Sequence, residues 1–198
     1  MSAAARVGAE TRWTTSDLDM FPDDGNRYEI IDGELYVSKQ PHFHHQTTCN
    51  RVALALTAWS DSAKLGLTIP APGIIFDVDD AVAPDVVWIS REQYARAIQP
   101  DGKLHLAPEL AVEVLSFGGR NEERDKALKL DLYSRRGVRE YWVIDWRVRR
   151  VDVYRRHEAA LRQIATLYAE DTLTSPLLPG FASPVAAFFA DIPEGAGE

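Results

Sequence analysis

A single acidic residue interrupts an otherwise apolar run in Leu110-Ala111-Val112-Glu113-Val114-Leu115. The length and apolar character of this run are typical of a strand in the centre of a sheet. Burying an unpaired carboxylate in such a strand costs on the order of several kcal/mol. A fold tolerates that cost when the charge faces a metal ion, a fixed cation or a cleft. The alternative is that Ala111, Glu113 and Leu115 face solvent, in which case Glu113 is an ordinary surface residue.

Strand and helix signals surround this run. Asp32-Gly33 lies between two apolar segments and predicts a β-hairpin over residues 28–37, because a type I′ turn needs two positive φ angles. Further strands are expected at 67–76, 85–89, 139–146, 149–155 and 161–168, and helices at 16–21, 43–60, 121–136 and 184–190. Strands dominate, so the predicted class is α/β (α+β) with a mixed central sheet.

The length of 198 residues suits one α/β domain. We expect frayed residues at 1–11, a single domain over 12–191 and a flexible tail over 192–198. No apolar run approaches the roughly 18 residues that span a bilayer, and residues 2–10 lack the apolar stretch of a signal peptide. The single cysteine excludes an internal disulfide and a multi-cysteine zinc site. These features predict a cytoplasmic protein without a membrane partner.

The net charge of −8 argues against a protein that holds nucleic acid by bulk charge alone. The charge is unevenly distributed, however. Residues 118–157 contain twelve Lys and Arg but seven Asp and Glu, a balance of +5, which leaves −13 on the rest of the chain. This basic segment either meets phosphates or forms a solvated helix face and an arginine-protected hairpin edge.

Asp85 follows Pro84 and opens a second apolar run over 86–89. A lone carboxylate at such a position commonly caps a turn. Together with Glu113 on a neighbouring strand, it offers two carboxylates that can converge on one hard cation. Mg²⁺ prefers oxygen ligands, and at such a site it polarises a phosphate and activates water. The pair therefore predicts a site for Mg²⁺ or Mn²⁺ suited to phosphodiester hydrolysis.

The helix expected at 121–136 adds a third element. Asp125, Lys129 and Tyr133 share one face of it, and Leu132 lies on an adjacent, inward-packing stripe. Lys129 is thereby carried beside the core, where it can hold the attacking water or offset charge on phosphorus. The alternative is a surface pair between Asp125 and Lys129, worth only about 0.3–0.5 kcal/mol.

Three histidines close together in the sequence raise the possibility of a zinc site, but their spacing does not suit one. The spacing of His42, His44 and His45 does not put two ligands on one helical face with a distant third, and Cys49 adds little. A histidine-based zinc hydrolase is therefore only a third hypothesis. His45 is expected near the site, where it either meets a phosphate or is a simple interfacial histidine.

Together these residues resemble the restriction endonuclease family often called Uma-two, a branch of the PD-(D/E)XK nucleases. The resemblance runs from about Thr15 to Tyr154. It is carried by Tyr28-Glu29, Asp32-Gly33-Glu34-Leu35, His45-Gln46, Pro84-Asp85, Glu113-Val114-Leu115-Ser116, Asp125, Lys129, Tyr133, Gly137-Val138, Glu140-Tyr141-Trp142 and Asp145.

This resemblance implies a restriction-endonuclease-like fold, with helices flanking a mixed central β-sheet and an N-terminal β-hairpin. It implies a divalent metal held by Asp85 and Glu113, with Lys129 as the catalytic lysine. Glu29 is implied as an additional acid, and a plain hairpin surface residue is its alternative. The broader superfamily has a lysine where this chain has Leu115, so Lys126 remains the alternative to Lys129.

The first functional hypothesis is a Mg²⁺- or Mn²⁺-dependent endodeoxyribonuclease. Arg120, Arg124 and Arg136 are candidates for contacts with DNA backbone phosphates, without sequence readout. A homodimer is expected, because cutting both strands with one site per chain needs two chains. The alternative, favoured by Leu115 and by the acidic balance, is a catalytically weak or inactive nuclease-fold module that binds DNA or acts as a scaffold.

Overall fold

The first hairpin has its turn at Asp32-Gly33, as the sequence predicts. Asp32 and Gly33 have φ angles of 53° and 74°, the two positive values that a type I′ turn needs. The turn joins β1 (Arg27–Ile31) to β2 (Glu34–Ser38), with Tyr28 opposite Val37. Because side chains alternate along β1, Arg27 and Glu29 project to the same face.

The computed structural model describes residues 11–116, 122–193 and 195, and the side chains of 122–125 are not described. Most of the expected frayed start and flexible tail therefore lies outside the described residues, although Ile192 is buried. The other elements are η1 (Thr15–Met20), α1 (Phe43–Ala63), β3 (Gly66–Pro70), β4 (Ile74–Asp77), β5 (Asp80–Val82), β6 (Val86–Ser90), α2 (Arg91–Ala97), β7 (Leu110–Val114), α3 (Glu122–Arg136), β8 (Glu140–Asp145), β9 (Arg150–His157), β10 (Ala160–Leu167), β11 (Thr172–Thr174), β12 (Ala182–Pro184) and η2 (Val185–Phe189).

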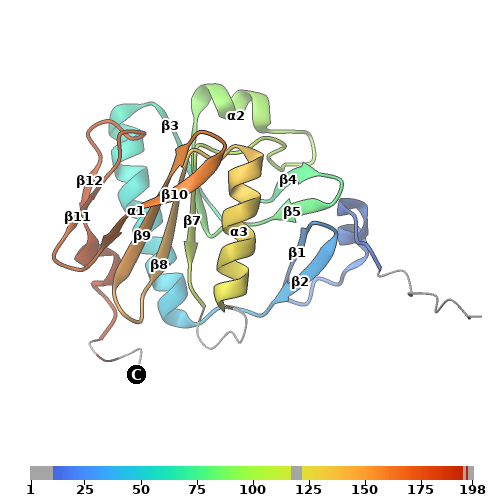
Figure 1. Cartoon of the computed structure of the whole chain (residues 1–198), viewed down its shortest axis with the longest axis horizontal. Coiled ribbons are helices and arrows are strands. Elements are labelled where there is room, and N and C mark those ends of the chain that lie inside the picture. The colour runs from blue at the N-terminus through green and yellow to red at the C-terminus, as the bar shows by residue number, and fades with distance from the viewer. Residues whose placement is uncertain (1–10, 117–121, 194, 196–198) are drawn as a thin grey trace, which may run out of the picture.

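The central sheet has six strands in the order β10-β9-β8-β7-β6-β3. β7 and β8 are parallel and the other neighbouring pairs are antiparallel, so the sheet is mixed, as predicted. The helix α3 connects the two parallel strands, which cannot be joined by a tight turn. A smaller antiparallel sheet has the order β2-β1-β5-β4, and β11 pairs with β12 (Figure 1).

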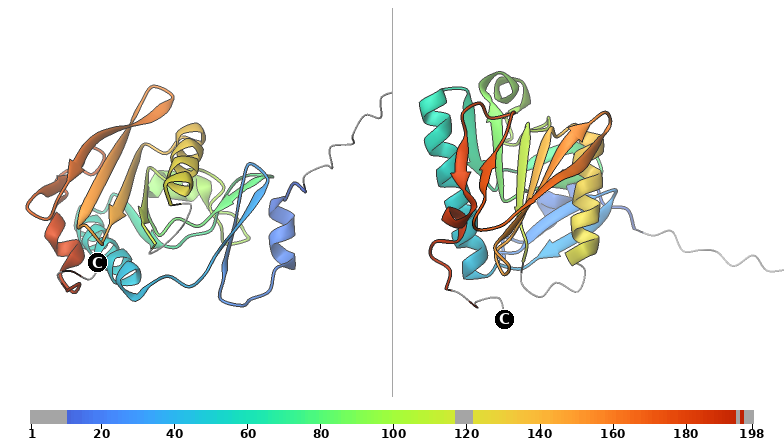
Figure 2. Two further views of the ribbon diagram at one scale, coloured as in Figure 1. Left: turned by 60° about the horizontal axis from the view of Figure 1, so that its bottom comes forward. Right: turned by 60° about the vertical axis from the view of Figure 1, so that its left-hand side comes forward.

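Helices cover both faces of the central sheet (Figures 1 and 2). On one face, Val112 and Val114 of β7 pack with residues of α1 and η2, including Val52 and Leu56. On the other face, Ala111 packs with residues of α3, including Leu132 and Tyr133. All five residues of β7 are buried, which explains why its sequence reads as an almost continuous apolar run.

The sequence prediction of one strand over residues 67–76 is wrong. The strand ends at Pro70, and the next residue, Ala71, has a φ of 45°. As a result β3 joins the central sheet while β4 joins the smaller sheet. The prediction also missed α2, which begins at the N-cap residue Ser90, whose side chain accepts a hydrogen bond from the backbone N–H of Gln93.

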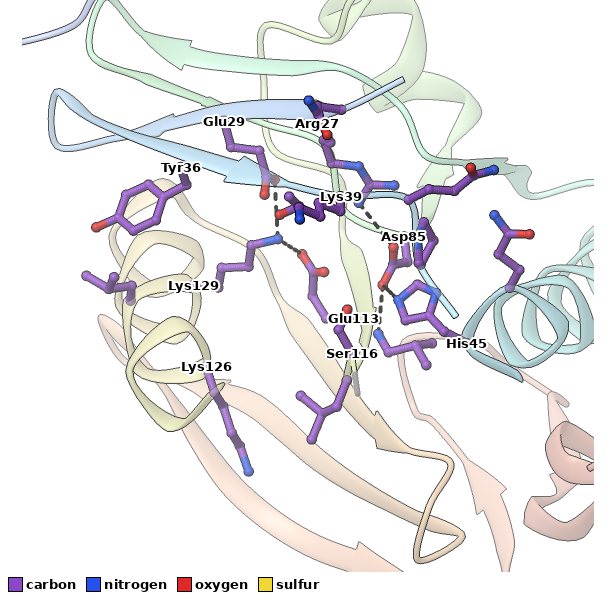
Figure 3. A pocket seen from close by; sticks show the side chains of 18 of the residues that line it. Arg27, Glu29, Tyr36, Lys39, His45, Asp85, Glu113, Ser116, Lys126 and Lys129 are labelled. Atoms are coloured by element: carbon purple, nitrogen blue, oxygen red, sulfur yellow. Dashed lines mark hydrogen bonds and ion pairs between the residues drawn. The ribbon is translucent and has the colours of Figure 1, made fainter. Parts of the chain in front are cut away.

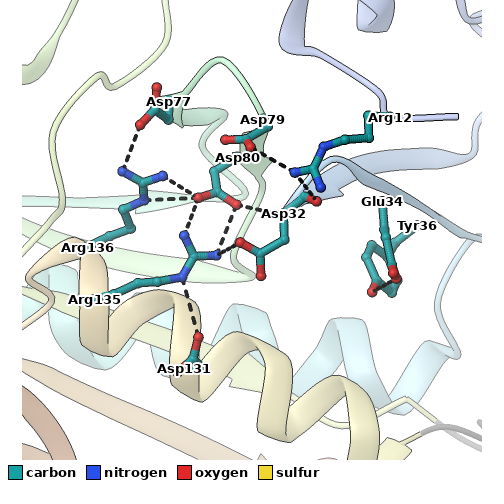
Figure 4. Close-up of polar contacts among 10 residues, drawn as sticks. All are labelled: Arg12, Asp32, Glu34, Tyr36, Asp77, Asp79, Asp80, Asp131, Arg135 and Arg136. Atoms are coloured by element: carbon teal, nitrogen blue, oxygen red, sulfur yellow. Dashed lines mark hydrogen bonds and ion pairs between the residues drawn. The ribbon is translucent and has the colours of Figure 1, made fainter. Parts of the chain in front are cut away.

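A buried aspartate ties the smaller sheet to α3 (Figure 4). Asp80 is fully buried and accepts hydrogen bonds from Arg135 Nη1 at 2.6 Å and Arg136 Nε at 3.0 Å. It also accepts the backbone N–H of Asp32 in the hairpin turn, at 2.9 Å. These contacts hold the hairpin against α3, and thereby bring β1 close to the face of α3 that carries Lys129.

Several described basic side chains of the segment over 118–157 form ion pairs or hydrogen bonds within the protein. Lys126 pairs with Asp152, and Arg155 pairs with Glu140. Arg156 donates to backbone carbonyls at the end of α3. These contacts support structural roles for much of the segment's charge. In the part of the chain that the structure describes, no helix is both long enough and apolar enough to cross a membrane.

Candidate active site

The pairing of β6 with β7 begins next to Asp85. Val86, the residue after Asp85, pairs with Val112, the residue before Glu113. Asp85 therefore lies near Glu113 at the start of β6, and both residues line the same pocket. Asp85 Oδ2 also accepts the backbone N–H of Val114 at 2.9 Å, which fixes the carboxylate beside β7.

Glu113 is buried rather than solvent-facing, with only 7% of its surface exposed, so the surface alternative is wrong. Its Oε1 accepts hydrogen bonds from Lys129 Nζ at 2.9 Å and from the hydroxyl of Tyr133 at 2.7 Å. Both donors come from the one face of α3 that the sequence singled out. The acid that interrupts the apolar strand is therefore compensated by a fixed cation.

Glu29 reaches the same lysine from the hairpin (Figure 3). Its Oε1 lies 3.2 Å from Lys129 Nζ and accepts the backbone N–H of Ala83 at 2.8 Å. Only 4% of Glu29 is exposed, so it is not the plain surface residue that was its alternative. Lys129 thus bridges two carboxylates from two different sheets.

Lys126 is engaged elsewhere. Its Nζ lies 3.0 Å from Asp152 Oδ2 and 6.0 Å from the centre of the Tyr154 ring. It lines the same pocket as Lys129, but its described carboxylate partner stands on β9 and not among the acids of the site. Of the two candidate lysines, Lys129 is the one that contacts Glu113.

Arg27 contacts the remaining carboxylate and was missed by the sequence analysis. Its Nη1 donates to Asp85 Oδ1 at 3.2 Å and to the carbonyl of Ala83 at 2.9 Å. A signal for it existed, because Arg27 stands two residues before Glu29 and therefore shares its face of the predicted hairpin.

His45 faces Asp85. Its Nε2 lies 3.2 Å from Asp85 Oδ2, and its Nδ1 lies 3.5 Å from the sulfur of Cys49, one helical turn further along α1. His45 is buried yet lines the pocket. The described contacts of its ring are thus with protein groups, and a phosphate contact stays a prediction.

The other residues predicted to touch phosphate lie apart from this cluster or are not described. Arg136 pairs with Asp80 and Asp77, as Figure 4 shows. Arg120 lies outside the described residues, and Arg124 lies in α3 with its side chain not described. The predicted phosphate contacts of these arginines are therefore untested.

The cluster lines a pocket of about 470 Å³. Four basic side chains line it, Arg27, Lys39, Lys126 and Lys129, against three acidic ones, Glu29, Asp85 and Glu113. Counting only Lys, Arg, Asp and Glu, the side chains that line the pocket have a formal charge of +1 in a chain of −8. The balance of charges that line the pocket is therefore opposite in sign to that of the whole chain, which favours the approach of an anion.

Asp85 and Glu113 differ in their readiness to ionise. Burial, only partly offset by Lys129, together with the charges of Asp85 and Glu29 raises the pKa of Glu113 to about 7. Burial would also raise the pKa of Asp85, but the hydrogen bond and charge of His45 outweigh it and lower that pKa to about 2. Burial acts to lower the pKa of Lys129, but Glu113 and Glu29 outweigh it and raise that pKa. Asp85 is thus the permanent anion of the pair.

The donor set suits a hard divalent cation. Asp85 and Glu113 both line the pocket with carboxylate side chains, and Mg²⁺ or Mn²⁺ prefers such oxygen ligands with remaining positions filled by water. Arg27 and Lys129 supply compensating positive charge at the same carboxylates. The residues present therefore fit a divalent ion.

Two comparisons with known proteins return matches. The profile of the Uma2 family, described as "Putative restriction endonuclease", matches residues 15–186. A crystal structure from Anabaena variabilis, titled as a putative nuclease belonging to DUF820, superposes with a TM-score of 0.72 at 15% identity, covering 89% of this chain and 97% of that one. This similarity confirms the predicted fold of a mixed sheet flanked by helices. No curated protein matches the chain.

Proposed function

The chain belongs to the Uma2 family, and from that premise we propose that it is a divalent-metal-dependent endodeoxyribonuclease. The proposal rests on one observation above all. Lys129 joins Glu113 to Glu29 within a pocket that Asp85, the residue before β6, also lines. Two acids and a lysine converging in this way make up the minimal set for metal-assisted phosphodiester hydrolysis.

In this proposal Asp85 and Glu113 hold Mg²⁺ or Mn²⁺. Such an ion supplies Lewis-acid stabilisation of the negative charge that develops on a phosphate. Lys129 keeps its proton, since its pKa is raised, and its Nζ donates hydrogen bonds to a water or to a phosphate oxygen. Glu29 orients Lys129 and is fixed in turn by the backbone N–H of Ala83.

DNA is the proposed substrate because the pocket is locally cationic. The guanidinium of Arg27 lies beside Asp85 with about a third of its side chain exposed, so it can contact a backbone phosphate without leaving the pocket. His45, Arg120, Arg124 and Arg136 remain further candidates for such contacts. A homodimer is proposed for cutting both strands, and sedimentation of the protein with and without duplex DNA measures it. A cytoplasmic location stays a prediction.

The test is cleavage of supercoiled plasmid and of single-stranded DNA in Mg²⁺ or Mn²⁺. Wild-type protein should cut at least one of them, and chelation of the metal should stop the reaction. The isosteric variants Asp85→Asn and Glu113→Gln should each lose on the order of 100-fold in rate or more. Cleavage that survives at the wild-type rate in Glu113→Gln would reject this assignment.

Metal binding is measured separately from cleavage. Mg²⁺ or Mn²⁺ should raise the melting temperature of the wild type and not that of Asp85→Asn, because only a ligand that binds the folded state stabilises it. Metal-dependent stabilisation without cleavage of any DNA would favour the alternative, a nuclease-fold module that binds DNA without cutting it.

A further inference from the structure

A second group of potential metal ligands includes Asp85 and two residues of α1. It consists of His45 and Cys49 on α1 and of Asp85 itself. One ligand atom from each residue lies within 4.8 Å of the other two. His45 and Asp85 are buried, and Cys49 is half-buried. The three donors are an imidazole nitrogen, a thiol sulfur and a carboxylate oxygen.

This donor set does not suit the ion proposed for the carboxylate pair. Mg²⁺ binds oxygen ligands, whereas thiolate and imidazole together select borderline-soft ions such as Zn²⁺ and Co²⁺. We propose that His45, Cys49 and Asp85 form a second, thiophilic metal site that shares Asp85 with the carboxylate pair.

Binding an ion requires the thiol of Cys49 to move. With bond lengths of about 2.0–2.3 Å, a tetrahedral zinc ion brings its ligand atoms to about 3.3–3.8 Å from one another. His45 Nε2 and Asp85 Oδ2 are already 3.2 Å apart. The sulfur of Cys49, now 3.5 Å from the other ring nitrogen, must turn toward Nε2. Rotation about the Cα–Cβ bond of Cys49 is the one side-chain rotation that moves this sulfur.

The pocket supplies the rest of the coordination. His45 and Asp85 both line the 470 Å³ cavity, so water can fill a fourth position. On binding, the thiol of Cys49 releases its proton to solvent and its sulfur forms the bond to the metal. Occupation of this site would withdraw Asp85 from the Mg²⁺ pair. Thiophilic ions should therefore inhibit DNA cleavage, an expectation that rests on the proposed function.

Cobalt makes the site visible without any activity measurement. A thiolate bound to Co²⁺ absorbs strongly in the near ultraviolet, and Cys49 is the only cysteine of the chain. Titrating the full chain with Co²⁺ should therefore produce this band in the wild type and not in Cys49→Ser. Zn²⁺ should bleach the band by displacing Co²⁺, since zinc binds such sites more tightly.

Three further variants test which residues form this site. Glu113→Gln should keep the cobalt band, because Glu113 is not among its ligands. His45→Gln and Asp85→Asn should weaken Co²⁺ binding at least about tenfold. A folded wild type without the band overturns the proposal, and so does a band whose midpoint is the same in His45→Gln, which would mean adventitious binding to the thiol. Failure of the DNA-cleavage test leaves the cobalt band untouched, so the two proposals fail separately.

Discussion

Lys129 reaches both Glu113 and Glu29 because its neighbours Leu132 and Tyr133 pack into the face of the sheet from which Glu113 projects. Helical spacing alone put Lys129 beside this apolar stripe, and only the packing settled which acids it meets. The alternative Asp125–Lys129 surface pair cannot account for a lysine whose side chain is just 15% exposed and contacts two acids.

Replacing Lys129 tests its role against that of Lys126. Lys129→Met should reduce metal-dependent cleavage by roughly 100-fold or more, because it removes the cation that faces the reacting phosphate. Lys126→Met removes an equal charge from the same pocket and serves as the matched control, with an effect below roughly tenfold. Single-turnover rates at saturating metal give the comparison. Equal losses in the two variants would show that only pocket charge matters.

Among the elements, β3 is held unusually close to β6. Gly66 pairs with Ser90, and a Cβ at Gly66 would meet the carbonyl oxygen of Ile89 and lie 2.6 Å from the ring of Trp88. The absence of a side chain at Gly66 therefore allows β6 to approach this end of β3 closely. The position matters for the site because β6 directly follows Asp85 in the chain.

Gly66→Ala should lower the free energy of unfolding by about 2–3 kcal/mol, since Trp88 and the backbone of β6 must shift to admit the methyl group. Gly102→Ala is the control, because Gly102 has a φ of 76° and open space around it. There only the backbone strain remains, about 1 kcal/mol. Urea unfolding midpoints measure both variants. An equal or smaller effect at Gly66 would contradict the close approach.

For the molecule as a whole, the contacts of Asp80 decide how the smaller sheet meets α3. Burial acts to raise the pKa of Asp80, but hydrogen bonds from Arg135, from the backbone N–H of Asp32 and from Arg136 outweigh it and lower that pKa. A carboxylate whose pKa is lowered on folding stabilises the fold above its unfolded pKa, and that stabilisation is lost as the pH falls through its folded pKa.

Asp80→Asn should therefore cost stability at neutral pH, by about 2–3 kcal/mol, because two partly buried arginines lose their anion. The difference from the wild type should begin to shrink near pH 4, where the carboxyl of the unfolded chain becomes protonated, and should be lost as the pH falls through the lowered pKa of the folded state. Asp61→Asn, at an exposed position of α1, is the control and should change little. Guanidinium unfolding from pH 7 to pH 2 follows the difference. A gap that stays constant down to pH 2 would contradict the role of the ionised carboxylate.

The sequence by itself determined the features that depend on neighbours along the chain. The Asp32-Gly33 turn, the apolar strand around Glu113 and the helix that carries Lys129 all follow from local backbone preference and side-chain periodicity. Together with the family resemblance, they were enough to predict a mixed sheet flanked by helices and to propose Asp85, Glu113, Lys129 and Glu29.

Only the tertiary structure decided which side chains meet. Glu29 and Lys129 are 100 positions apart, and Arg135 and Asp80 are 55 apart. Whether Lys126 or Lys129 contacts Glu113, and that His45 and Arg27 face Asp85, depends on how the two sheets dock on α1 and α3. The division of residues 67–76 into β3 and β4 also depends on tertiary structure. Both segments have strand character in the sequence, and they are separate strands because each joins a different sheet. Periodicity reports which face a residue occupies, and packing of distant segments determines what that face touches.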